Sequence, residues 1–193
     1  SMQPKRTAHV IGNGPSKRFF QETNDFTVAC NLEWNIRHDV VSIIDPQPIV
    51  YMQENKMRTK KPIWCTSNVS LLNISKGLRM NVVHEYRSKW RFNSGHQAVK
   101  RLCDMGYTDI HLWGFDSIWT EDMSSSMDAM VERTYRKPTL KKEWFINWQD
   151  IHHKYANTNF WLHIPAQDKF RNDKTRFKTH AHLDLSFKPN KTK

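Results

Sequence analysis

Short apolar runs bounded by turn residues recur along most of the chain, and they are the main indication of its fold. Each run has the length of a buried strand. The candidate strands are Ala8–Ile11, Thr27–Cys30, Val40–Ile44, Pro62–Cys65, Asn81–His84, Asp109–Trp113 and Asn159–Ile164. Continuous apolar runs are typical of a parallel sheet, because helices cover both of its faces.

Two longer segments between these runs show helical periodicity. The first ends at Gly106, a natural helix stop. Its apolar positions are Ala98, Leu102 and Met105. The second, 141–155, carries a stripe of Trp144, Phe145, Trp148 and Ile151. Each leads into a candidate strand, as in half of a βαβ unit. The pattern therefore predicts an α/β fold with a single Rossmann-like, mostly parallel sheet and helices on both faces.

The length of 193 residues suits one compact domain, which we place at residues 3–165. The character of the chain changes after Pro165. Residues 166–193 hold eight Lys or Arg against three Asp and few aliphatic side chains. We expect this basic C-terminal extension to be unnecessary for the core fold and to contact an anionic partner.

The whole chain is strongly basic, with a formal net charge of +11 and a pI near 9.7. This charge favours an anionic partner, such as a nucleotide, a nucleic acid, an acidic glycan or a membrane surface. The alternative is a solvated basic surface with no specific partner. The sequence leaves the oligomeric state open.

The cysteines and the apolar runs indicate where the protein works. Cys30, Cys65 and Cys103 are far apart, which fits reduced core thiols and neither a zinc site nor a disulfide framework. No apolar run approaches the length of a membrane span, and no signal peptide is visible. We therefore expect a cytoplasmic protein without a membrane span.

A glycine-rich turn, Gly12-Asn13-Gly14-Pro15-Ser16, directly follows the first candidate strand. Its glycines permit positive φ and a close approach of the backbone to a ligand, and Ser16 is a favourable N-cap. Backbone amides at such a turn form a site for phosphate. By itself the motif fits a tight turn equally well.

Four further segments follow this turn in a recognisable order. They are Cys30-Asn31, Ser94-Gly95, Met105-Gly106-Tyr107 and Gly114-Phe115-Asp116. Together with the turn, they resemble the Campylobacter-type CMP-sialic acid sialyltransferases and related Rossmann-like proteins that share Gly-Asn-Gly-Pro-Ser. The resemblance extends over residues 8–165.

The resemblance implies a pocket for a cytidine monophosphate donor at the carboxyl ends of the strands. The nucleotide-binding residues that it implies are Asn13, Gly14, Ser16, Asn31, Ser94, Gly95, Gly114 and Phe115. Asn and Ser offer neutral donors, and the glycines allow close approach. Asp116 can accept hydrogen bonds from ribose hydroxyls or an amine.

The chain departs from the family at positions that matter for chemistry. The family's Asn-Pro-Ser is Asp45-Pro46-Gln47 here, and a carboxylate repels a phosphate. Leu140 falls where the family has its histidine base. Ile118 and Lys137 stand where tyrosines assist the leaving phosphate. We therefore expect sialic acid transfer to be absent or very weak.

His96 and Asp116 are the candidate catalytic residues. His96 follows Ser94-Gly95 at the start of a predicted helix, where the helix dipole would lower its pKa and keep it neutral as a base or donor. Basic residues between Arg133 and Lys142 are candidates to contact the acceptor or the leaving phosphate, unless they form a solvated loop. Within that stretch we single out Arg136, Lys137, Lys141 and Lys142.

These features favour a glycosyltransferase-like protein that binds a nucleotide or nucleotide-sugar donor and transfers its group to an anionic or glycan acceptor. The first alternative is a protein that binds or modifies nucleic acid on a catalytically altered nucleotide fold. A second is nucleotide pyrophosphotransfer, for which Asp45 and Asp116 are the obvious pair of Mg²⁺ ligands. We predict no dedicated metal site and no cofactor besides the donor substrate, and the need for a divalent metal stays open.

Overall fold

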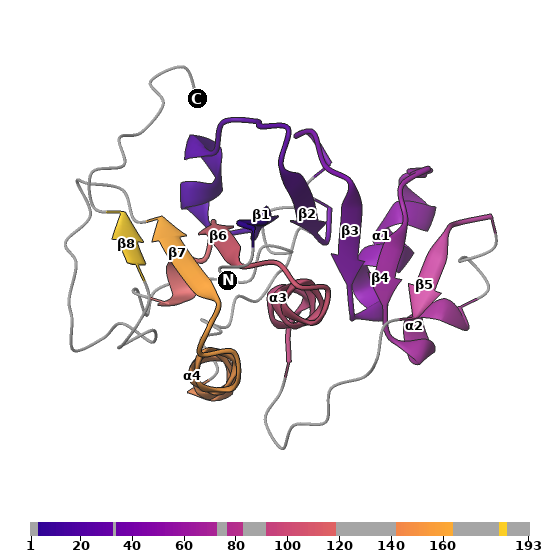
Figure 1. Cartoon of the computed structure of the whole chain (residues 1–193). Coiled ribbons are helices and arrows are strands. Elements are labelled where there is room, and N and C mark those ends of the chain that lie inside the picture. Colours follow the sequence, from indigo (N-terminus) through magenta and orange to yellow (C-terminus); the bar gives the residue numbers. More distant parts are fainter. Residues whose placement is uncertain are drawn as a thin grey trace.

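The protein, described by a computed structural model, is built around one sheet of eight parallel strands (Figure 1). The structure describes residues 4–32, 34–72, 77–82, 92–118, 142–163 and 182–184. The strands are β1 (Thr7–Ile11), β2 (Phe26–Cys30), β3 (Val40–Ile43), β4 (Ile63–Cys65), β5 (Met80–Val82), β6 (Asp109–Trp113), β7 (Asn159–His163) and β8 (His182–Asp184). Their order in the sheet is β5-β4-β3-β2-β1-β6-β7-β8. The predicted fold class is confirmed, and all seven predicted strands are present with small shifts in their ends.

Four α-helices and two short 3₁₀ turns connect the described strands. The helices are α1 (Pro46–Glu54), α2 (Ser67–Ser70), α3 (Ser94–Asp104) and α4 (Lys142–Lys154). The 3₁₀ turns are η1 (Pro15–Phe19) after β1 and η3 (Asp116–Ile118) after β6. Both helices that the periodicity predicted, α3 and α4, are present.

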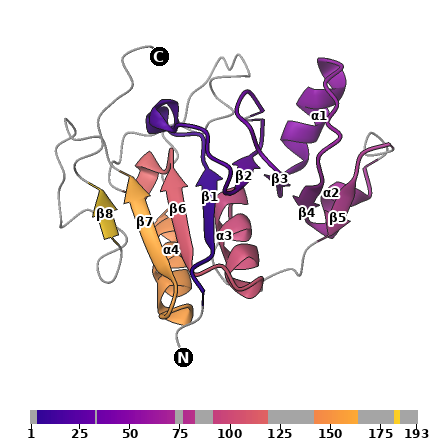
Figure 2. The same ribbon diagram turned by 45° about the horizontal axis from the view of Figure 1, so that its top comes forward.

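Helices cover both faces of the sheet, as alternate residues of β3 show. Val40 belongs to the core that α3 and α4 share with the central strands. Val41 and Ile43 instead pack with Ile49 and Met52 of α1. Since successive side chains of a strand point to opposite faces, α1 lies across the sheet from α3 (Figure 2).

The basic C-terminal extension contributes a strand to the sheet. β8 pairs with β7 in parallel, with Leu183 opposite Leu162. The proposed boundary at residue 165 therefore does not mark the end of the sheet's strands. That the core folds without the extension stays a prediction.

The strand order reverses at β1. From β1 the chain builds the sheet outward through β2, β3, β4 and β5, then crosses over to place β6 on the other side of β1. Open α/β sheets bind their ligands at such a switch point, outside the carboxyl ends of the strands. Here those are the loops that follow β1 and β6.

Candidate functional site

Backbone hydrogen bonds join the loops that follow β1 and β6. The Gly12 amide donates to the Trp113 carbonyl at 2.7 Å, and the Gly14 amide donates to the Gly114 carbonyl at 2.7 Å. These contacts extend the β1–β6 ladder past the end of both strands. The glycine-rich turn is therefore held against the Gly114-Phe115-Asp116 segment.

Glycines permit this contact by their lack of a side chain. Gly14 has φ −63°, an ordinary value, so the positive φ that glycine permits is not used at this residue. A Cβ on Gly14 would collide with the Asp116 carboxylate and lie 2.7 Å from the Gly114 carbonyl oxygen. Positive φ occurs across the contact instead, at Gly114, with φ +75°. Close approach of two backbones is thus the reason for glycine at position 14.

Ser16 and Asp116 connect the same two loops through side chains. The Ser16 hydroxyl donates to Asp116 Oδ1 at 2.6 Å, and the Ser16 amide lies 3.3 Å from each carboxylate oxygen. Both residues are buried. The predicted N-cap role of Ser16 is wrong, because Gly14 takes the N-cap position of η1 and Ser16 lies inside it. A catalytic role for Asp116 stays a prediction beside this structural one.

Asn31 lies at the carboxyl end of β2 in a tightly fixed conformation. Its φ is +58°, a left-handed value that asparagine tolerates better than most residues. Its amide donates to the Ser42 carbonyl at 2.9 Å, and its carbonyl accepts from the Trp34 indole at 3.0 Å. Its side-chain Oδ1 accepts from the Ser94 hydroxyl at 3.0 Å. Among the described residues, no hydrogen bond engages the Nδ2 group, so its protons are available to a ligand.

Asn13, in the glycine-rich turn, presents a second carboxamide. Within the described part of the chain, its buried Oδ1 has no hydrogen-bond partner. A buried acceptor without a donor costs free energy, so a ligand hydroxyl or amine would stabilise this conformation. Asn13 and Asn31 thus offer complementary groups at the ends of β1 and β2.

The start of α3 is capped by Asn93 and His96. Asn93 Oδ1 accepts from the His96 amide at 2.9 Å, while His96 Nδ1 accepts from the Asn93 amide at 3.0 Å. The His96 ring is fully buried, with its centroid 4.4 Å from that of Trp148. Nδ1 is therefore unprotonated and engaged in the cap. The catalytic role of His96 stays a prediction, while these contacts show a capping role that the sequence analysis missed.

The remaining predicted residues fall into three groups. Gly95 and Phe115 are in contact, since a Cβ on Gly95 would lie 2.5 Å from the Phe115 ring. Asp45 is exposed just after β3, where it is the N-cap residue of α1. Of the basic candidates, Lys142 is the first residue of α4. The others, Arg136, Lys137 and Lys141, lie outside the described residues, as does Leu140.

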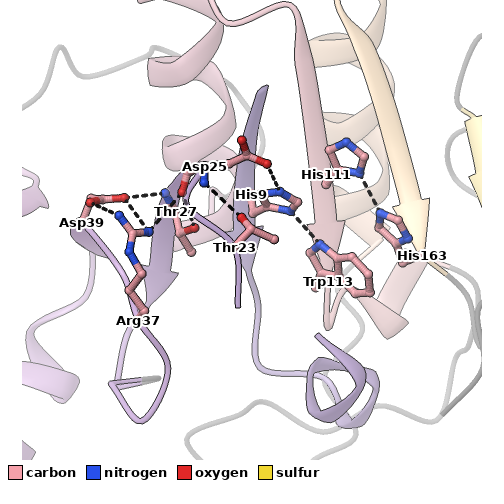
Figure 3. A network of polar contacts seen from close by, with 9 residues as sticks. All are labelled: His9, Thr23, Asp25, Thr27, Arg37, Asp39, His111, Trp113 and His163. Carbon is pink, nitrogen blue, oxygen red and sulfur yellow. Dashed lines mark hydrogen bonds and ion pairs between the residues drawn. The ribbon is translucent and has the colours of Figure 1, made fainter. Parts of the chain in front are cut away.

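A second polar cluster lies on the sheet face opposite α3 and α4, and the sequence analysis missed it (Figure 3). The Trp113 indole donates to His9 Nδ1 at 3.0 Å, so the His9 proton is on Nε2 and points to Asp25 Oδ2, also at 3.0 Å. His111 Nδ1 lies 2.8 Å from His163 Nε2, which requires one proton between them. His163 stacks on Trp113 with centroids 3.6 Å apart. The cluster spans β1, β6 and β7.

Burial lowers the pKa of two histidines of this cluster, His9 and His111. It lowers the pKa of His9, against the opposing effect of Asp25. The pKa of His111 is lowered to about 4, first by burial and then by the neighbouring His9 and His163. His111 and Trp113 occupy alternate positions of β6, and His9 and His163 lie on the same face in β1 and β7. This alternation in the sequence could have indicated a polar layer on one face of the sheet.

Neither a metal centre nor a membrane span emerges from the described residues. Across those residues, no group of three or more His, Cys, Asp or Glu side chains is arranged to hold a metal ion. Nor does any helix among them have the length and apolar character needed to cross a bilayer.

A parallel sheet with a glycine-rich turn at its switch point defines a Rossmann-like α/β domain. No protein-family model and no curated protein matches the chain. Solved structures of the sialyltransferase CstII from Campylobacter jejuni do match it. The complex with the substrate analogue CMP-3FNeuAc has a TM-score of 0.52 at 11% identity, over 96% of this chain and 88% of that one.

Two further structures of this sialyltransferase give the same result. The complex with cytidine-5'-monophosphate has a TM-score of 0.54 at 13% identity, over 96% of this chain and 87% of that one. A point variant in complex with CMP has a TM-score of 0.54 at 11% identity, over 96% and 88%. The chain therefore has the fold of this sialyltransferase, and the resemblance inferred from its motifs is confirmed.

Proposed function

We propose that the protein is a glycosyltransferase that binds a nucleotide-sugar donor at the carboxyl ends of β1, β2 and β6 and transfers the sugar to a glycan or anionic acceptor. The observation that carries this proposal is the pair of carboxamides, Asn13 and Asn31, beside the joined loops of the switch point. CMP and a CMP-sugar analogue are bound by proteins of the same fold.

The chemistry of the site suits a phosphate with a hydroxylated sugar. Asn31 Nδ2 is a neutral donor for a phosphate oxygen, and Asn13 Oδ1 is an acceptor for a hydroxyl or amine. Asp45 follows β3, the strand next to β2, and its carboxylate is exposed. The negative charge of Asp45 disfavours another carboxylate at this edge of the sheet. This charge favours a donor whose sugar carries no carboxylate.

The transfer step needs a base for the acceptor hydroxyl and positive charge for the leaving nucleotide. Asp116 is our candidate for the base. His96, whose Nδ1 lone pair already accepts from the Asn93 amide, is our candidate for a hydrogen-bond donor through Nε2. The basic residues Arg136, Lys137, Lys141 and Lys142 would stabilise the charge that develops on the leaving phosphate. In this proposal the protein itself supplies that positive charge.

Calorimetric titration of CMP, UDP, GDP and ADP into Asn31→Asp tests the proposal. This variant tolerates the left-handed φ and still accepts from Ser94, but it replaces the Nδ2 donor with a negative charge. We expect the affinity of the tightest nucleotide to fall at least about tenfold. The matched control is Asn81→Asp, which adds the same charge at the exposed edge strand β5 and should keep wild-type affinity. Equal affinities of both variants would contradict the assignment.

A further inference from the structure

A chain of buried hydrogen bonds runs from β4 through α3 to Asn31. It begins at the Trp64 carbonyl, which accepts from Gln97 Nε2 at 3.0 Å. Gln97 Nε2 also donates to the Ser42 hydroxyl at 3.1 Å. Ser42 in turn donates to the Ser94 carbonyl at 2.8 Å. The side chains of Gln97, Ser42 and Ser94 are all buried.

The last link of this chain reaches the candidate site. The Ser94 hydroxyl lies 3.4 Å from the Ile44 amide, from which it accepts, and donates to Asn31 Oδ1 at 3.0 Å. A hydroxyl has one proton, so this donation fixes which end of the Asn31 carboxamide faces Ser94. Nδ2 is then directed away from the Ser94 hydroxyl.

We infer that Ser42 and Gln97 are positioning residues, which act through Ser94 to hold the Asn31 carboxamide with its Nδ2 group presented to the donor phosphate. The inference rests on the proposed function for its ligand. Ser42 and Gln97 lie in the buried layer between the sheet and α3, so they act on the ligand only through this chain. Ser94 itself acts as a fixed hydrogen-bond donor to Asn31.

The physical reason for such a chain is the cost of ordering a side chain. A freely rotating carboxamide presents its oxygen to a phosphate as often as its amino group, and the oxygen repels it. Orienting the group before binding removes that cost. The Ser42 hydroxyl joins Gln97 to the Ser94 carbonyl, so its loss leaves both groups without their shared partner and removes a constraint on Ser94.

Ser42→Ala is the informative variant, because it breaks the chain without touching the ligand site. Gln97→Met provides an independent break of similar volume. The control is Thr27→Val, which removes another fully buried hydroxyl, one that donates to the Asp25 carbonyl at 2.9 Å. We expect all three to lower the melting temperature, but only Ser42→Ala and Gln97→Met to weaken CMP or UDP binding, by about three- to tenfold.

A double-mutant cycle distinguishes positioning from general destabilisation. In the background of Asn31→Gly, which tolerates the positive φ, Ser42→Ala should have no further effect on nucleotide affinity. Equal losses in both backgrounds, or the same loss in Thr27→Val, would overturn the inference.

The orientation of Asn31 can also be measured without any ligand. The side-chain amide resonances of Asn31 are assigned by their absence in Asn31→Gly. Ser42→Ala should lower the order parameter of this amide below about 0.6, whereas Thr27→Val should leave it at the wild-type value. An unchanged order parameter in Ser42→Ala would overturn the inference. If the wild-type protein bound no nucleotide at all, the proposed function would fail, and this measurement would still decide the positioning role.

Discussion

The Ser16 hydroxyl donates to the Asp116 carboxylate at 2.6 Å, and this bond joins the two loops at the switch point of the sheet. The residues are 100 positions apart in the sequence and both are buried. The loop after β1 and the loop after β6 therefore depend on one another for their conformation.

Removal of this hydroxyl should destabilise the protein. Ser16→Ala removes the hydrogen bond that the Ser16 hydroxyl donates to the buried Asp116 Oδ1, at a cost of about 1–3 kcal/mol. We expect thermal unfolding to begin several degrees lower. Ser70→Ala is the control, since the Ser70 hydroxyl donates to the Ser67 carbonyl within its own short helix. Equal melting temperatures of the two variants would show that the Ser16–Asp116 bond contributes little.

Gly14→Ala should damage both stability and nucleotide binding. Its φ suits alanine, so the effect is steric: the added Cβ meets the Gly114 carbonyl oxygen and the Asp116 carboxylate. Overpacking of this kind costs about 1–3 kcal/mol and here displaces a loop of the site.

The matched variant for this test is Gly77→Ala. Gly77 has φ +82° and its nearest neighbour is the flexible end of the Arg58 side chain. Alanine at this positive φ lowers the free energy of unfolding by about 1–2 kcal/mol, and Gly77 lies beside the edge strand β5, far from the switch point. Calorimetry should show nucleotide affinity lost in Gly14→Ala and retained in Gly77→Ala. Retention in both would mean that the loop contact is unrelated to binding.

Stability should decrease with acidity because of the histidine cluster. The pKa of His111 is about 4 in the folded protein and 6.5 as a free side chain, mainly because the ring is buried. Between these values the unfolded chain binds more protons, so the free energy of unfolding falls as the pH is lowered from 6.5 to 4. Since the ring is partly exposed, we expect a loss of about 1–2 kcal/mol.

Urea unfolding at several pH values measures this effect. His111→Gln keeps a polar partner for His163 but does not titrate, so it should reduce the slope of stability against pH. His153→Gln replaces an exposed histidine of α4 and should keep the wild-type slope. A wild-type slope in His111→Gln would show that the cluster does not govern acid stability.

CMP-sialic acid should be a poor donor. Leu140 stands where the resemblance to the sialyltransferases implies a histidine base. The negative charge of Asp45 also disfavours the carboxylate of sialic acid. We expect little release of CMP from CMP-sialic acid in the presence of a glycan acceptor, measured by coupled phosphate detection. Rapid, acceptor-dependent release would mean that another residue serves as the base.

The sequence was informative where burial determines the structure. Strands such as Ala8–Ile11 are apolar because both faces of the sheet are covered, so the pattern predicted them directly. Helix α1 was missed because Pro46 and Pro48 look like turn residues, although proline is tolerated in the first turn of a helix. β8 was missed because it lies in a polar, basic segment with no apolar run.

The geometry of the site depends on contacts between distant residues, which no local pattern reveals. Ser16 has the sequence context of an N-cap, yet its partner Asp116 follows β6. His96 was chosen for its place near a helix N-terminus, where it instead completes a capping box with Asn93. The motif order pointed to loops that the fold brings into contact, but only the fold shows which of their atoms are already paired.

The most direct test of nucleotide binding at the carboxyl ends of β1 and β2 is to locate a bound nucleotide. A crystal of the protein soaked with CMP, or with the tightest of UDP, GDP and ADP, would show the position of the phosphate. We expect a phosphate oxygen within hydrogen-bond distance of Asn31 Nδ2, beside the joined loops that contain Gly14 and Gly114. A nucleotide bound elsewhere, with Asn13 and Asn31 untouched, would contradict it.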